Sequence, residues 1–286
     1  MSLLNVGINM NDLMTLLRVS SFEQLLIAYE KVNGGKLDFD VIDGGAGVGQ
    51  TSRQMQKYLS STRTVFAFEP YPGNHKFFKY EESQIVLVKK ALAEIEKKMT
   101  FRVPSVVSDN STWGKQGYAG YSSVGYLATG NINSATDIEV DCVDADNEIP
   151  VTSNVGFIKL DLQGGELNAL QGMKKLLRNT KLMWIEFTNQ PGMLDFLTTE
   201  GFIIFDTEYF LMGEKSYAAL AEFDISKPDI TLSTGQHAWF GFRKYAWHNY
   251  SSTFEKQRNE HKLVQTDLVC VNRSFFGDFM LALKYL

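Results

Sequence analysis

Short apolar runs alternate with stretches of helical spacing through most of the chain. Five of the runs are typical of buried strands, near residues 39–43, 65–69, 85–88, 155–161 and 181–187. Helices are predicted between them, near 50–60, 73–80 and 165–178. Strands and helices in this order favour a mainly parallel sheet with helices on both faces. The pattern therefore predicts a doubly wound α/β fold.

The two ends of the chain follow other patterns. Residues 11–31 predict two short helices with a break at Ser20-Ser21, and they end before Asn33-Gly34-Gly35. After Phe187, residues 201–205 and 238–242 predict two closing strands that form an antiparallel edge of the sheet. Phe275, Phe276, Phe279 and Met280 have helical spacing, and this last helix packs either on the domain or on a second copy of the chain, as in a homo-oligomer. We predict an N-terminal helical extension (1–38), a central domain (39–243) and a C-terminal extension (244–286).

A long loop interrupts the regular alternation. Residues 99–103 and 138–143 alternate as extra strands, and residues 109–133 between them are rich in Gly, Ser and Tyr. Loops of this length without a helix commonly bind a ligand or are disordered. Trp113 and three tyrosines argue against disorder. Two interpretations remain, a lid that contacts a substrate and a packed surface loop.

A glycine-rich turn follows the first predicted strand. Residues 41–49 read Val-Ile-Asp-Gly-Gly-Ala-Gly-Val-Gly, with a carboxylate at Asp43 and a helix from Gln50. Glycines there let the backbone approach a ligand closely and leave the helix N-terminus free to meet it. Glu69 ends the next strand, where a carboxylate can accept hydrogen bonds from both ribose hydroxyls. Together they predict a site for an adenosine-containing cofactor.

The details of this turn separate two cofactors. A nicotinamide fold favours G-x-G-x-x-G/A, but Gln50 stands where the last small residue would be, and Gly49 comes one position early. Asp43 beside a pyrophosphate would repel it, whereas it would attract the ammonium-bearing methionine portion of S-adenosylmethionine. The residues favour S-adenosylmethionine over NAD.

Composition limits the class of partner. The chain has 286 residues, 44% of them hydrophobic, and a net charge of -5, which argues against a nucleic-acid surface. Cys142 and Cys270 are too few for a disulfide framework, and we therefore expect a reducing, cytoplasmic compartment. No basic segment with an apolar signal core opens the chain, and no apolar run nears the roughly 20 residues of a membrane span.

A second acidic strand end follows at Asp161. Phe157-Ile-Lys-Leu-Asp161 ends a predicted strand, and Leu162-Gln-Gly-Gly-Glu166 turns into a helix. Ligands of doubly wound sheets bind outside the carboxyl ends of the strands, so we expect Asp161 beside Asp43 and Glu69, with Glu186 near the same edge. Glu166 is interpreted as a first-turn acid that the helix dipole favours. Lys159 is either a paired strand lysine or an active-site cation.

These motifs, in their order, resemble the FkbM-type S-adenosylmethionine-dependent methyltransferases. The resemblance covers residues 39–243 and includes VIDGGAGVGQ, FEP, VDCVDADNEI, FIKLDLQGGELNALQGMKKLL and WIEF. The family usually carries Asp-Val-Glu-Gly-Ala-Glu where this chain has Asp161-Leu-Gln-Gly-Gly-Glu166, so Gln163 removes one negative charge. The resemblance implies a class I methyltransferase (Rossmann-like) fold. It also implies methyl transfer to a hydroxyl, often on a sugar or natural product.

The predicted site collects these residues. The expected cofactor-binding residues are Asp43, Gly44, Gly45, Ala46, Gly47, Gly49, Gln50, Glu69, Pro70, Ala91 and Asp161. The expected catalytic residues are Asp161, His237 and Lys159. Asp161 is either the general base for the acceptor hydroxyl or a residue that holds a loop or the cofactor's amino end. His237 is the second candidate base, because the ordinary pKa of histidine suits that role. No dense ligand motif supports a metal, although Asp161 with Glu186 or Asp144 could hold one.

Three functions are compared. The first is an O-methyltransferase that uses S-adenosylmethionine, releases S-adenosylhomocysteine and acts on a small-molecule or glycan acceptor. The second is an NAD-dependent Rossmann oxidoreductase, which Asp43 and Gln50 disfavour. The third is a non-catalytic binding protein with a methyltransferase fold, because a fold does not determine a function. The sequence favours the first.

Overall fold

The strands of the protein are divided between two compact units. The computed structural model describes residues 21–79, 83–103, 122, 125–127, 136–187, 190, 192–206, 230–231, 237–238 and 266–285. Residues 38–179 form one compact unit, the central unit. Residues 1–37 together with 180–286 form the other, the flanking unit.

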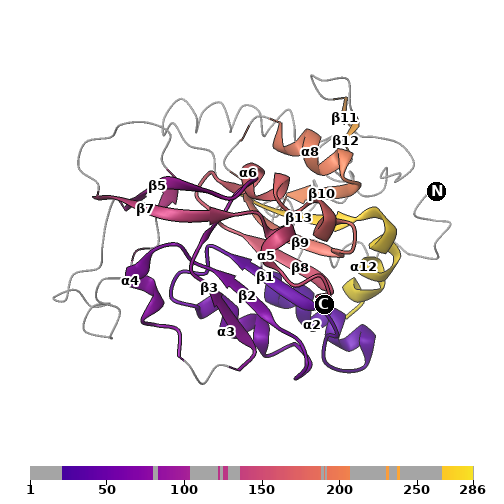
Figure 1. Cartoon of the computed structure of the whole chain (residues 1–286). Coiled ribbons are helices and arrows are strands. Elements are labelled where there is room, and N and C mark those ends of the chain that lie inside the picture. Colours follow the sequence, from indigo (N-terminus) through magenta and orange to yellow (C-terminus); the bar gives the residue numbers. More distant parts are fainter. Residues whose placement is uncertain are drawn as a thin grey trace. The chain divides into compact units, whose positions relative to one another are not determined.

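Four parallel strands form the core of the central unit (Figure 1). Their order is β8 (Val155–Leu160), β1 (Asp40–Gly44), β2 (Val65–Phe68) and β3 (Ile85–Val88). Every residue of β8, β1 and β2 is buried, which explains their nearly continuous apolar sequences. In this register Asp43 lies opposite Lys159 of β8 and Ala67 of β2.

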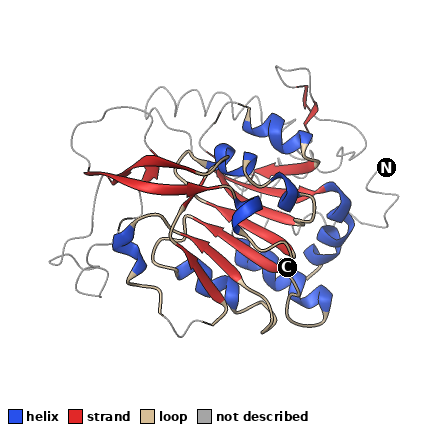
Figure 2. Cartoon of the chain, in the orientation of Figure 1, coloured by secondary structure: helices blue, strands red, loops and turns tan. Residues whose placement is uncertain are grey.

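Short helices lie between the strands of the central unit (Figure 2). They are α3 (Gln50–Gln56), α4 (Pro72–His75), α5 (Ala145–Glu148), α6 (Glu166–Gln171) and α7 (Lys174–Leu177). The single helix predicted over 165–178 is wrong, since the chain breaks between α6 and α7. A Cβ on Gly172 would lie 2.0 Å from the Ala93 carbonyl oxygen, so the backbones meet there. The Asp146 carboxylate then accepts the first amides of α7, from Lys175 and Leu176.

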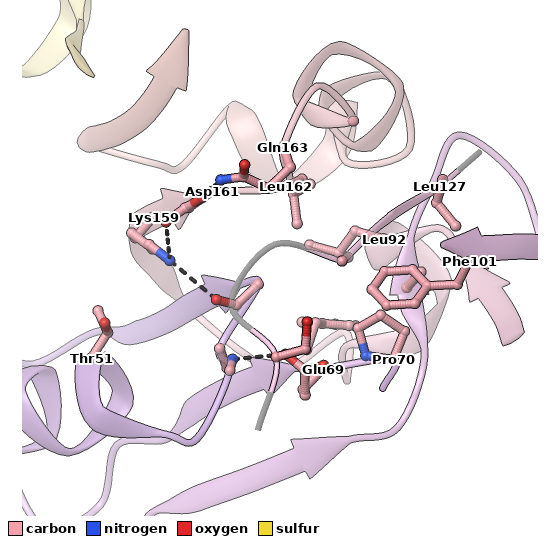
Figure 3. Close-up of a pocket in the computed structure, with 18 of the residues that line it drawn as sticks. Thr51, Glu69, Pro70, Leu92, Phe101, Leu127, Lys159, Asp161, Leu162 and Gln163 are labelled. Carbon is pink, nitrogen blue, oxygen red and sulfur yellow. Dashed lines mark hydrogen bonds and ion pairs between the residues drawn. The ribbon is translucent and has the colours of Figure 1, made fainter. Parts of the chain in front are cut away.

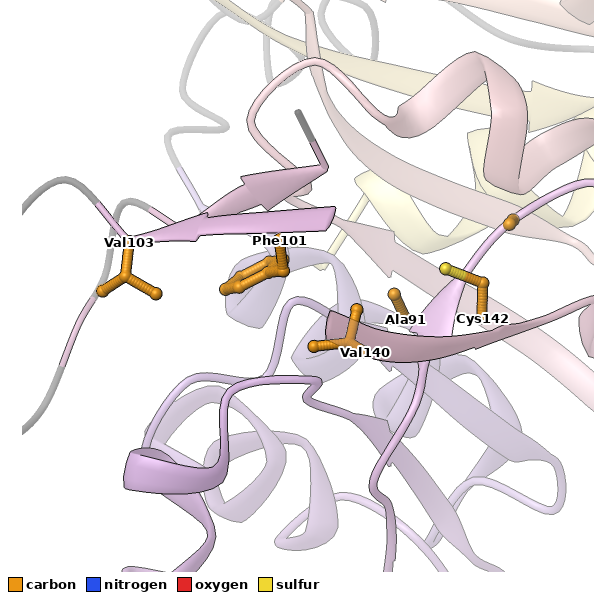
Figure 4. Close-up of a cluster of buried hydrophobic side chains, with 6 residues drawn as sticks. Ala91, Phe101, Val103, Val140 and Cys142 are labelled. Carbon is orange, nitrogen blue, oxygen red and sulfur yellow. The ribbon is translucent and has the colours of Figure 1, made fainter. Parts of the chain in front are cut away.

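A second, smaller sheet belongs to the central unit. Its strands are β4 (Ala91–Leu92), β7 (Thr136–Val143), β5 (Lys97–Val103) and β6 (Tyr126–Leu127), in that order. The extra strands predicted near 99–103 and 138–143 are thus confirmed, and they pair antiparallel. Their inward side chains form an apolar cluster that includes Phe101, Val140 and Cys142 (Figure 4). Most of the predicted loop 109–133 lies outside the described residues.

The flanking unit contains its own antiparallel strands. Here β13 (Thr266–Asn272) pairs antiparallel with both β9 (Leu182–Phe187) and β10 (Phe202–Asp206). The unit also contains α8 (Met193–Thr199), the 3-10 turn Arg273–Phe275 and α12 (Phe276–Leu283), which packs on α2 (Phe22–Asn33). Ser21 and Gln24 form a capping box at the start of α2, as the predicted break at Ser20-Ser21 requires. The helix predicted before that break lies outside the described residues.

The antiparallel edge is confirmed, but one of its two strands was assigned wrongly. The predicted strand 201–205 corresponds to β10. The described part of the predicted strand 238–242 instead belongs to β12 (His237–Ala238), which pairs with β11 (Ile230–Thr231) in a separate small sheet. The partner of β10 comes from residues 266–272, within the segment predicted as a C-terminal extension.

Candidate functional site

A pocket of about 180 Å³ lies at the carboxyl ends of the parallel strands of the central unit (Figure 3). Residues that follow β1, β2 and β8 line it, as expected for a ligand site of a parallel α/β sheet. The predicted site residues that line it are Gly45, Ala46, Gly47, Gln50, Glu69, Pro70, Ala91, Lys159 and Asp161. Asp43, Gly44 and Gly49 do not line it.

The pocket has further walls that the sequence did not reveal. Leu92, Phe101 and Leu127 lie together on the side of Pro70, whereas Asp161 and Gln163 lie on another side (Figure 3). Phe101 and Leu127 come from β5 and β6 of the smaller sheet. A strand pattern shows which residues share a face, but it does not show which sheet closes over a pocket. Phe101 and Leu127 could therefore not be predicted as pocket residues from the sequence.

The glycine turn after β1 packs directly on the end of β8. Gly45 has a φ of 73°, and a Cβ there would lie 2.0 Å from the main-chain oxygen of Asp161. The Asp161 amide donates to the Gly44 carbonyl at 3.1 Å. Glycine at position 45 is therefore needed both for its backbone conformation and for this close approach.

Asp43 lies beneath the turn and is fully buried. Its Oδ2 accepts a hydrogen bond from the Ser52 hydroxyl at 2.6 Å, and its Oδ1 lies 3.5 Å from Nζ of Lys159. Burial raises the pKa of Asp43, while the charge of Lys159 and the Ser52 hydrogen bond act against the rise. The partners of this carboxylate are protein groups.

Lys159 connects the two acidic strand ends. Its buried ammonium lies 3.5 Å from Asp43 Oδ1 and 3.6 Å from Asp161 Oδ2. It also donates to the carbonyl oxygens of Gly44 at 3.4 Å and Gly45 at 3.3 Å. Of the two interpretations of this lysine, the geometry supports a paired one that also reaches the pocket wall.

Asp161 is the accessible acid of this group, with 44% of its side chain exposed. Its Oδ1 accepts a hydrogen bond from the side-chain amide of Gln163 at 2.8 Å. Gln163 has a φ of 53°, a left-handed conformation that is uncommon for residues other than glycine. The buried carboxylate of Glu166 accepts the amides of Leu162 at 2.6 Å and Gly164 at 3.1 Å, and it thereby fixes the turn.

Glu69 lies at the pocket wall after β2. Its carboxylate accepts the main-chain amides of Gly47 at 2.7 Å and Tyr71 at 2.8 Å. Burial raises the pKa of Glu69 to about 7, although both amide hydrogen bonds lower it. The acid predicted to bind ribose thus joins the glycine turn to the segment after β2.

Residues 43–204 match the family model of the methyltransferase FkbM domain, which is more than half of the chain. The chain belongs to the FkbM methyltransferase family. The resemblance seen in the sequence is confirmed, and so is the class I methyltransferase fold that it implied. Both acidic strand ends lie inside the matched FkbM domain.

Solved structures give weaker matches. A methyltransferase FkbM from Methylobacillus flagellatus KT is 15% identical, with a TM-score of 0.33, over 52% of this chain and 32% of that chain. The chain therefore spans about a third of the length of that relative. A precorrin-6y C5,15-methyltransferase from Geobacter metallireducens GS-15 is 12% identical, with a TM-score of 0.35, over 66% of this chain and 76% of that one. No curated protein matches the chain.

The remaining predicted residues lie elsewhere. His237 lies on β12 in the flanking unit, beyond the residues that match the FkbM domain. Asp144 caps α5 through a 3.0 Å hydrogen bond from the Asn147 amide, and Glu186 is buried on β9 of the flanking unit. Within the described parts of the chain, no three His, Cys, Asp or Glu side chains gather as a metal site. The same parts contain no helix long and apolar enough to cross a membrane.

Proposed function

We propose that this FkbM-family protein is an S-adenosylmethionine-dependent O-methyltransferase. We propose as its acceptor a hydroxyl of a sugar, a glycan or another natural product. The observation that carries the proposal is one pocket, inside the matched domain, that contains both the glycine turn and the buried acid Glu69. Methyltransferases of this family use S-adenosylmethionine in general, which supports the choice of cofactor.

The residues of the pocket fit an adenosyl cofactor. Glu69 uses one lone pair of each oxygen for a main-chain amide, and a carboxylate has further lone pairs for ribose hydroxyls. Pro70, Leu92 and Phe101 offer an apolar surface for a base. The acidic side of the pocket at Asp161 suits the cationic end of the cofactor.

When bound, S-adenosylmethionine supplies a methyl group on a positively charged sulfur. The protein has to hold the acceptor oxygen in line with that carbon, which contributes up to about 7–11 kcal/mol in favourable cases. The hydroxyl also loses a proton. Asp161 and His237 are the residues that the sequence proposes as the base. The two roles of Asp161, base and partner of the amino end, make different predictions for ligand binding.

Calorimetry of the whole chain tests the cofactor. We expect S-adenosylmethionine and S-adenosylhomocysteine to bind with one ligand per chain, and NAD to give no heat of binding. Glu69→Ala should abolish binding of both adenosyl ligands. Glu30→Ala on α2, at a half-buried residue that pairs with Lys36, should leave this binding intact. Binding of NAD without binding of either adenosyl ligand would refute the proposal.

Transfer of a labelled methyl group tests the reaction. The acceptors to compare are free sugars, oligosaccharides and hydroxylated small molecules, with amines as the contrasting panel. Label in a base-stable ether product supports O-methylation, and label in an amine panel member contradicts it. Tight binding of the cofactor without transfer to any acceptor favours the non-catalytic alternative.

The cytoplasmic location and the homo-oligomer stay predictions.

A further inference from the structure

We propose that Asp161, and not Asp43, is the carboxylate that binds the ammonium group of the cofactor. Lys159 and Gln163 are positioning residues that hold Asp161 for this contact. The inference rests on the proposed function, because it assigns one end of the same cofactor. It differs from the interpretation of the glycine turn from sequence, in which Asp43 attracts that ammonium group.

The first argument is that an ammonium group of the protein already occupies the place beside Asp43. Nζ of Lys159 lies 3.5 Å from the Asp43 carboxylate and donates to the carbonyl oxygens of Gly44 and Gly45. Whichever of the two side chains holds the proton, Asp43 and Lys159 together carry no net charge. Asp43 is also fully buried and does not line the pocket. The pair therefore offers a ligand no net charge, and Asp43 offers it no accessible surface.

The second argument is a charge count at the pocket wall. Asp161 adds one negative charge to the neutral pair, so the group of three carries a net charge of -1. Nearby acids have other partners: Glu166 accepts main-chain amides of its own turn, and Glu69 accepts those of Gly47 and Tyr71. Only Asp161, among these acids, exposes a large part of its side chain, 44%. A single ammonium group complements this arrangement.

Gln163 explains how the carboxylate is held. Its amide donates to Oδ1 at 2.8 Å, while Lys159 lies 3.6 Å from Oδ2, so each oxygen has a partner among the described residues. A carboxylate accepts more than one donor per oxygen, so a ligand ammonium can still be received. A neutral amide adds this hydrogen bond without a charge that competes for the ligand. The left-handed backbone of Gln163, at φ 53°, aims its side chain back at Asp161.

The test compares two ligands that differ in the amino-acid end, which carries the ammonium group and a carboxylate. S-adenosylhomocysteine carries the amino-acid end, and 5′-methylthioadenosine lacks it but keeps the adenosine and the sulfur. For Asp161→Asn, calorimetry should show a dissociation constant about 10- to 100-fold higher for S-adenosylhomocysteine, as expected for the loss of a charged hydrogen bond. Binding of 5′-methylthioadenosine should change less than about 2-fold. Glu69→Gln is the matched control, and it should weaken both ligands.

Gln163→Leu tests the positioning role. This variant keeps a side chain of similar size on the same backbone but removes the amide, so the melting temperature should be nearly unchanged. We expect S-adenosylhomocysteine to bind about 3- to 10-fold more weakly and 5′-methylthioadenosine to bind as before, since a neutral hydrogen bond is lost indirectly.

The outcomes separate the inference from the proposed function. If the parent protein binds neither ligand, the proposed function fails. If it binds both, and Asp161→Asn weakens both equally or neither, the inference is wrong while the function stands. If Asp43→Asn weakens the binding of S-adenosylhomocysteine alone, and Asp161→Asn leaves it unchanged, then Asp43 is the carboxylate that binds the ammonium group.

Discussion

The two turns that follow β1 and β8 have similar sequences, but their aspartates differ in burial and in partners. Each begins with an aspartate at a strand end, continues through glycines and enters a helix. Asp43 at the first turn is fully buried, whereas 44% of the Asp161 side chain at the second is exposed. In the register of the two strands, Asp43 lies opposite Lys159, which precedes Asp161 by two positions. One lysine on β8 thus pairs with the first acid in the protein interior, whereas the second acid stays accessible.

The two turns also differ in the residues that adopt positive φ angles. In the first turn, positive φ angles occur at Gly45, Gly47 and Gly49, where they cost little. In the second, Gln163 adopts such an angle beside Gly164, and its side chain holds Asp161. Strain at a residue that contacts a pocket is typical of functional sites. The comparison teaches that a strand-end acid should be judged by the cations and the strain around it.

The largest effect should come from the contact between the turns. In Gly45→Ala the new methyl group would lie 2.0 Å from the Asp161 oxygen, on a backbone at φ 73°. We expect a loss of at least about 4 kcal/mol in unfolding free energy, measured with urea. The matched control is Gly164→Ala, which also has a positive φ but no atom within 4 Å, and it should cost about 1–3 kcal/mol. Equal losses would show that the turns do not depend on their contact.

Removal of the lysine should have the next largest effect. Lys159→Met leaves the buried Asp43 without its cation, and breaking such a pair costs about 3–5 kcal/mol. The loss should be smaller at pH 5 than at pH 8, because Asp43, whose pKa is already raised by burial, takes up a proton more readily at low pH.

The double variant Asp43→Asn/Lys159→Met sharpens this comparison. It should recover at least about 2 kcal/mol relative to Lys159→Met, since neither position of the former pair then carries a charge. Asp161→Asn should give no such recovery in the Lys159→Met background, because Asp161 is partly exposed to water. Equal recovery of stability from Asp43→Asn and Asp161→Asn would mean that the two acids depend equally on Lys159.

Glu69 adds a third strand-end acid, which has amide partners in place of a cation. Its pKa is about 7 in the folded protein, above the usual value of 4.5, so the folded state binds the extra proton between these values. The contribution of Glu69 to stability is thus greatest below about pH 4.5 and falls as pH rises to about 7, by up to about 3 kcal/mol. Denaturant unfolding across this range should show the slope, and Glu69→Gln should remove it. A slope that survives in the variant would assign it to other groups.

Much of the fold followed from the sequence because β1, β2, β8 and β9 are buried along their whole length. Continuous apolar runs located β1, β2, β3, β8 and β9, and the glycine turn and Glu69 located the pocket wall. The order of strands across the smaller sheet did not follow, because it depends on long-range pairing. β13 was missed for a related reason, because its pairing with β9 and β10 brings together residues far apart in the chain.

The roles of the site residues were harder to predict than their positions. The motif VIDGG shows an acid at a strand end, but the partner of that acid lies more than a hundred residues later, at Lys159. Sequence spacing contains no information on this pairing until the register of β1 and β8 is known. The position of Gln163 in the family motif drew attention to the second turn, and only its backbone angle and its hydrogen bond to Asp161 suggest why an amide is present.

The smallest effect should come from Gln163 itself. Gln163→Gly and Gln163→Ala both remove the hydrogen bond to Asp161, but only glycine relieves the left-handed backbone at φ 53°. The glycine variant should therefore be more stable than the alanine variant by about 1 kcal/mol, after the greater flexibility of unfolded glycine is subtracted. Thermal unfolding of the two variants measures the difference, and equal stabilities would show that the backbone is unstrained. If the difference is found, a chain optimised for stability alone would carry glycine at this position, and the presence of Gln163 is then explained by its contact with Asp161.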